Sequence, residues 1–78
     1  MSPPYTVGQT VVYKPIGGPE SENTPESLGL ITGVLTSPGK IDEYNVEASP
    51  EEPTYEIENM STKKKSPIKD ANVLRIHI

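Results

Sequence analysis

The stretch "VVYKPIGG" (residues 11–18) decides the fold, because it begins as a strand and then ends abruptly. Two β-branched valines and a tyrosine favour an extended, half-buried segment. Pro15 has no N–H to donate to a sheet, and the pair Gly17-Gly18 lets the chain turn away. We therefore expect a first strand over residues 5–14, with Val7 on its buried face, and a long polar loop over residues 15–27.

Four further short blocks favour strands. The block "LGLITGVLT" (residues 28–36) is almost continuously apolar, and the two glycines inside it suggest a bulge or a sharp bend. In "TYEIENM" (residues 54–60) apolar and acidic residues alternate, which predicts one buried and one exposed face. The last two strands are a short segment around Ile68 and the block "VLRIHI" at residues 73–78.

The segments between these blocks predict turns and loops. We expect a second, acidic loop over residues 37–53, a hairpin turn over residues 61–64 and a single tight or 3₁₀-type turn over residues 69–72. No window places apolar residues at helical spacing, so no α-helix longer than one turn is expected. The prediction is an all-β fold, a small five-stranded SH3-like barrel with two long polar loops over residues 5–78, after a short tail at residues 1–4.

Composition narrows the class of protein. The chain has 78 residues, enough for one small domain. Because only 32% of its residues are hydrophobic, a disordered chain is the alternative to a folded domain. Because the apolar residues cluster in blocks, a folded domain is favoured. There are no cysteines and one histidine, so we expect no disulfide, metal site or cofactor. Without a secretory signal or an apolar run of about 20 residues, an intracellular protein with no membrane contact is expected.

The net charge of −4 conceals an asymmetry. Residues 1–58 hold two lysines and ten acidic residues, a net charge of −8, whereas residues 59–78 have a net charge of +4. The acidic part argues against a general nucleic-acid binder, which needs a concentrated basic face.

Three stretches carry a family resemblance: "YTVGQTVVYKPIGGP", "LGLITGVLTSPG" and "NVEASPEEPTYEIEN". Together they resemble the fungal hypervirulence-associated protein Tudor domain family, formerly a domain of unknown function, over about residues 5–74. The resemblance implies an SH3-like Tudor fold, a fungal source and a cytoplasmic or nuclear location. It implies no established enzymatic activity and no secure ligand.

A Tudor-type site would surround a methylated cation with aromatic rings. The candidate partner-binding residues are Tyr13, Tyr44 and Tyr55, with the acidic residues Asp42, Glu43 and Glu47. The alternative is that Tyr13 and Tyr55 are core residues, and strand alternation favours it by turning both rings inward.

A second candidate surface is basic. It consists of Lys63, Lys64, Lys65, Lys69 and Arg75, which could contact nucleic acid. The alternative is a solvated hairpin whose lysines protect an edge strand. No aromatic residue lies between these lysines, so the sequence alone offers no stacking surface.

The chain offers no catalytic constellation, since no nucleophile accompanies His77 and no phosphate-binding glycine loop is present. Five Ser/Thr-Pro pairs suit turns and proline-directed kinases. We expect a non-catalytic module, monomeric or weakly dimeric, that binds a basic protein segment with or without methylation. The alternatives are a nucleic-acid-associated module and a structural domain that self-associates through an edge strand.

Overall fold

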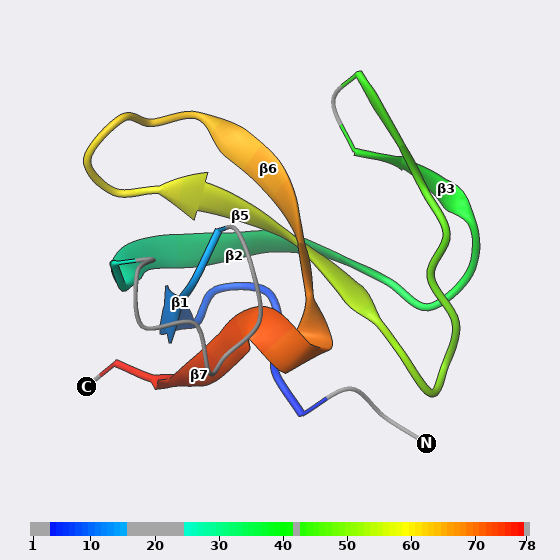
Figure 1. Cartoon of the computed structure of the whole chain (residues 1–78), viewed down its shortest axis with the longest axis horizontal. Helices are drawn as coiled ribbons and strands as arrows, with labels where there is room; N and C mark the ends of the chain where they lie inside the picture. The colour runs from blue at the N-terminus through cyan, green and yellow to red at the C-terminus, as the bar shows by residue number, and fades with distance from the viewer. Residues whose placement is uncertain (1–3, 16–24, 42, 78) are drawn as a thin grey trace.

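The computed structural model describes residues 4–15, 25–41 and 43–77, which form an all-β domain. Five strands make one antiparallel sheet in the order β6-β5-β2-β1-β7, and β3 and β4 make a separate hairpin (Figure 1). The elements are β1 (Thr10–Tyr13), β2 (Ser27–Leu35), β3 (Gly39–Ile41), β4 (Tyr44–Val46), β5 (Thr54–Asn59), β6 (Lys65–Lys69), the 3₁₀ turn η1 (Asp70–Asn72) and β7 (Val73–Ile76).

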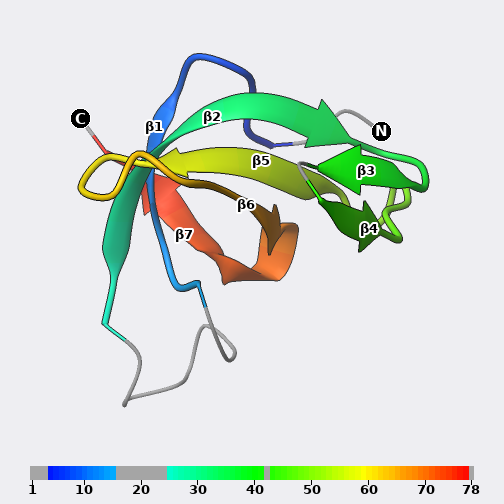
Figure 2. The same ribbon diagram turned by 90° about the horizontal axis from the view of Figure 1, so that it is seen from above.

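The nine-residue β2 is the centre of the sheet, because it pairs with β1 along its first half and with β5 along most of its length. A bulge lies between Ile31 and Gly33, as the glycines in this block predicted. The hydroxyl of the intervening Thr32 donates to Oε1 of Glu56 at 2.7 Å. Bulges increase local twist, and Figure 2 shows β2 curving strongly.

The core lies on one face of this curved sheet. Successive side chains of a strand point to opposite faces of the sheet, so every second residue of each strand points into this core. At its centre, Gly29 has no side chain, and a Cβ atom there would overlap Ile57 and lie 2.8 Å from Cε1 of Tyr13. The buried cluster consists of Val11, Tyr13, Ile31, Tyr55, Ile57, Ile68 and Val73. The absence of a side chain at Gly29 therefore lets β1 and β5 pack their large residues across β2.

The predicted start of the first strand is wrong. β1 begins at Thr10 rather than at residue 5, and Val7 is 61% exposed instead of buried. Gly8 has a φ of +98°, which ends the extended conformation before the strand. Its N–H donates to the carbonyl of Ile31 at 2.9 Å, so the turn is attached to β2 without joining the ladder.

The second predicted loop, residues 37–53, is also corrected, because it contains the β3–β4 hairpin. Each strand has only three residues, which is too short for a clear alternating pattern. The hairpin has a small core of its own, in which Ile41, Val46 and Ala48 are buried and Leu35 of β2 packs against them. Figure 2 shows the hairpin beyond the ends of β2 and β5.

A closed barrel is not confirmed. Within the described residues, β6 and β7 are the two edges of the sheet, and no strand pairing joins them. Figure 1 shows β6 leading into η1, from which β7 runs back to pair with β1. The predicted hairpin turn and 3₁₀ turn are confirmed, and the described residues contain no α-helix. Most of the first predicted loop, residues 16–24, lies outside the described residues, and β2 already begins at Ser27.

We expect Gly29→Ala to lower the free energy of unfolding by about 2 kcal/mol, because the new methyl group would overlap Ile57 and Tyr13. Gly33→Ala is the matched control, since its nearest neighbour would be Cβ of Glu56 at 3.4 Å. It should change the stability by less than about 0.5 kcal/mol. Urea unfolding of both variants measures the difference, and equal stabilities would contradict the role assigned to Gly29.

Candidate edge groove

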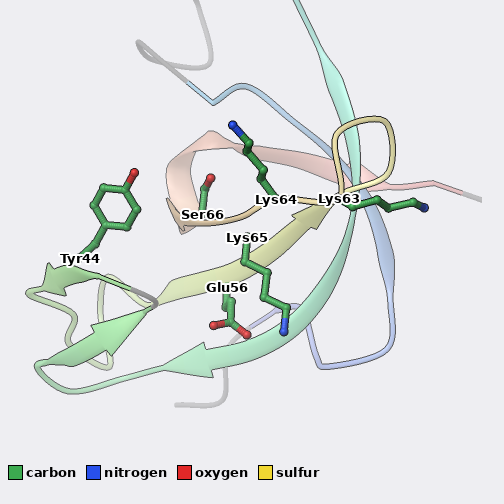
Figure 3. Close-up of a pocket in the computed structure, with 6 residues that line it drawn as sticks. All are labelled: Tyr44, Glu56, Lys63, Lys64, Lys65 and Ser66. Carbon is green, nitrogen blue, oxygen red and sulfur yellow. The ribbon is translucent and has the colours of Figure 1, made fainter.

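A hollow lies between the β3–β4 hairpin and the end of the β5–β6 hairpin, and we call it the edge groove. It is open to solvent and has a volume of about 600 Å³. Tyr44 of β4 forms one wall and β6 with its preceding turn forms the other (Figure 3). The lining residues are Tyr44, Glu56, Lys63, Lys64, Lys65 and Ser66.

Asn59 shapes the turn that carries the lysines. Its Oδ1 accepts hydrogen bonds from the N–H groups of Ser61 at 2.8 Å and Thr62 at 3.0 Å. Its carbonyl accepts from the N–H of Lys63, which has a φ of +63°, and Nδ2 donates to the Tyr13 hydroxyl at 3.0 Å. One side chain thus fixes the lysine turn and ties it to the core.

The groove is predominantly basic, because three lysines face a single carboxylate. That carboxylate, on Glu56, accepts a hydrogen bond from the Thr32 hydroxyl. Figure 3 shows Lys64 and Ser66 extending to the same side of β6 as the Tyr44 ring, while Lys65 extends with Glu56 to the opposite side. Lys63 extends away from Tyr44 in the same view. Among the three lysines, Lys64 is therefore the one that extends on the side of Tyr44.

The three candidate tyrosines are not brought together at one surface. Tyr13 and Tyr55 are 2% and 0% exposed, which confirms their interpretation as core residues. Tyr44, by contrast, is 54% exposed. Its ring is therefore the one of the three that a partner could reach without rearrangement of the core.

Tyr55 has a polar partner inside the core. Its hydroxyl donates to Oδ1 of Asp70 at 2.8 Å. The rings of Tyr5 and Tyr55 pack edge to face, with their centroids 5.7 Å apart. Burial raises the pKa of Tyr55 above its usual value of 10.0, and the bond to the Asp70 carboxylate raises it further. The phenol is therefore held neutral and joins β5 to η1.

The two candidate acidic residues that the structure describes, Glu43 and Glu47, do not line the edge groove. Glu43 and Glu47 are exposed, and Glu47 lines a smaller hollow of about 170 Å³ that also includes Lys69. Asp42 lies outside the described residues. The partner-binding role of these acids stays a prediction.

The candidate basic residues divide into two groups. Lys63, Lys64 and Lys65 line the edge groove, whereas Lys69 does not. Arg75, on β7, is paired with Glu26 at 3.2 Å. The nucleic-acid role predicted for all five also stays a prediction, but the structure gathers only three of them.

Two groove residues, Glu56 and Ser66, were not candidates from the sequence. The sequence also did not predict that Tyr44 lines the same hollow as the lysines. Nothing in the local pattern indicated it, because Tyr44 lies on a strand that was expected to be loop and is distant in sequence from the lysines.

Within residues 4–15, 25–41 and 43–77, no three His, Cys, Asp or Glu side chains gather as metal ligands would. Over the same ranges, no helix has the length and apolar character needed to cross a membrane.

Comparison with known proteins identifies the class and then the family. A small all-β domain with an exposed groove is typical of binding modules, and the family model described as "Hypervirulence associated proteins TUDOR domain" matches residues 8–73. The chain belongs to this family. It is also 38% identical over 72 residues to the "Putative primary metabolism protein prl65" of Schizosaccharomyces pombe, covering 92% of each chain. No solved structure gives a significant match.

The raised pKa of Tyr55 predicts a loss of stability in alkali. Above about pH 10, Tyr55 loses its proton in the unfolded state but keeps it in the folded state. The unfolded state is therefore stabilised relative to the folded state as the pH rises. The free energy of unfolding should fall with a contribution from Tyr55 of up to about 1.4 kcal/mol per pH unit.

Urea unfolding of the wild type and Tyr55→Phe from pH 9 to pH 12 measures this contribution, because all other titrating groups are common to both proteins. The variant should lose less stability than the wild type as the pH rises. Parallel pH profiles would show that Tyr55 titrates alike in both states.

Proposed function

We propose that this chain is a non-catalytic, intracellular binding module that takes a negatively charged protein segment in the edge groove. The observation that carries the proposal is that Tyr44, a half-exposed ring, shares one hollow with Lys63, Lys64 and Lys65. Aromatic rings anchor many protein interfaces, and lysines around such an anchor select the sign of the partner. Membership of a Tudor-type family supports a protein or peptide partner in general.

The sign of this partner differs from the basic segment expected from the sequence. That expectation rested on the acidic loops, with Tyr13, Tyr44 and Tyr55 nearby, but the rings of Tyr13 and Tyr55 are buried. Three lysines line the hollow that the exposed ring shares, and their charge would repel a basic or methylated segment. An anionic segment gains from the same charges, so the geometry favours it.

A single-stranded nucleic acid is the second candidate. Tyr44 supplies the aromatic platform that the lysine run lacks in sequence, and bases stack on such rings. A protein segment is preferred because the chain as a whole carries a charge of −4, with the acidic excess in residues 1–58, which opposes a long polyanion.

The fold supports the same conclusion. We infer that the bent five-stranded sheet is an open relative of the SH3-like barrel, given its late hairpin and the 3₁₀ turn before its last strand. The module is monomeric in this proposal, and its partner is another protein.

The test is an amide-resolved NMR titration with three ligands: a peptide of alternating Glu and Thr, one of alternating Lys and Thr, and a short single-stranded oligonucleotide. The acidic peptide should shift the amides of Tyr44 and of the lysine turn. We expect Tyr44→Ala to weaken its binding about tenfold and Lys64→Ala about fivefold.

Lys40→Ala is the matched control, because Lys40 is an exposed lysine on β3 that does not line the groove. It changes the net charge as Lys64→Ala does, and it should leave the affinity nearly unchanged. Equal losses of affinity in Lys64→Ala and Lys40→Ala would show that the peptide is attracted by the net charge alone. Tighter binding of the oligonucleotide at the same amides would favour the second candidate, and binding of the lysine peptide alone would contradict the proposal.

A further inference from the structure

The outer edge of β6 forms one side of the edge groove. The hydrogen bonds of the β5–β6 ladder determine which backbone groups of β6 face this edge. At one end of the β5–β6 ladder, the N–H of Asn59 donates to the carbonyl of Lys64 at 2.9 Å. At the other end, the N–H of Asp70 donates to the carbonyl of Pro53 at 2.9 Å. Bonded and non-bonded pairs alternate in an antiparallel ladder, so the even-numbered residues of β6 bond to β5 and the odd-numbered ones face outward.

Two outward residues concern the groove: Lys65 lines it, and Pro67, the next outward residue of β6, lines the adjoining smaller hollow. Lys65 presents both an N–H and a carbonyl to the outer edge, whereas Pro67 presents a carbonyl alone because it has no N–H. In the part of the chain that the structure describes, no backbone hydrogen bond joins β6 to β3 or β4. Between Lys65 and Pro67 the edge can therefore accept hydrogen bonds at two positions and donate at one.

We propose that the negatively charged segment binds as an added strand, paired with β6 from Lys65 to Pro67 and lying between this edge and Tyr44. The inference rests on the proposed function, since it specifies how the same groove holds its partner. Strand addition takes affinity from backbone hydrogen bonds and specificity from alternate side chains. Here the residues of the segment that face Lys64, Ser66 and Tyr44 should be acidic, because Lys64 extends to that side.

A second copy of the chain is a poor occupant of this edge. Two β6 strands would bring Lys64 and Lys65 close to their own copies, and like charges repel. Each copy would also lack the donor at Pro67. Proline and lysine on an edge are the features that natural sheets use against self-pairing. Pairing of this edge with a second β6 strand is thus disfavoured, whereas pairing with an acidic strand is not.

The test uses the Glu/Thr peptide in three forms: unmodified, N-methylated on every glutamate, and N-methylated on every threonine. All three have the same charge. In an added strand, alternate N–H groups point to β6, so methyl groups in one form block pairing and in the other point to solvent. We expect one methylated form to bind at least about tenfold more weakly and the other to bind like the unmodified peptide.

Pro67→Val gives an independent measurement, because it restores an outward N–H on the edge of β6 next to the groove, in a residue that favours strands. It should tighten binding of the unmodified peptide about fivefold, the effect of one net hydrogen bond. Preserved NMR shifts of the core amides and an unchanged melting temperature would show that the variant keeps the fold.

The outcomes separate the two proposals. Equal affinity of all three peptides, with no gain in Pro67→Val, would overturn strand addition and leave the groove as a binding site. No binding of the unmodified peptide would overturn the proposed function and strand addition together. A concentration-dependent mass of the wild type without peptide, with shifts at Lys65, would assign the edge to a second copy instead.

Discussion

The close approach of three strands at Gly29 is the constraint on which the sheet depends. β2 lies between β1 and β5, and the large residues of its neighbours, Tyr13 and Ile57, meet over the position where Gly29 has no side chain. A domain without Phe or Trp has few large side chains to fill a core, and here Tyr13 and Tyr55 are packed in full. The two core tyrosines accordingly have polar partners for their hydroxyls, in Asn59 and Asp70.

These polar partners connect the core to the candidate site. Asn59 donates to Tyr13 with its amide nitrogen and holds the lysine turn with its amide oxygen. The position of Lys63 and Lys64 is therefore set by a side chain that is anchored in the core rather than by the turn alone. A rigid turn loses little conformational entropy on binding, which favours recognition by a small domain.

Much of the main sheet could be predicted from the sequence, because its strands carry clear signals. Alternation in "TYEIENM", the glycine-interrupted apolar block of β2 and the turn residues after Asn59 each correspond to an observed element. The errors lie where a signal was short or depended on backbone torsion. Val7 fitted the period of β1, but the positive φ of Gly8 removes it from the strand. The three-residue strands β3 and β4 were too short to show a period.

The candidate site was harder to predict than the fold, and for the same reason. Each half was visible in sequence, the lysine run on one side and an unburied tyrosine on the other, but their meeting depends on the unpredicted β3–β4 hairpin. The hairpin holds Tyr44 over the edge of β6 because Ile41 and Val46 pack with Leu35 at the end of β2. A hydrophobic contact of the smaller core thus brings two separate surface features together in one groove.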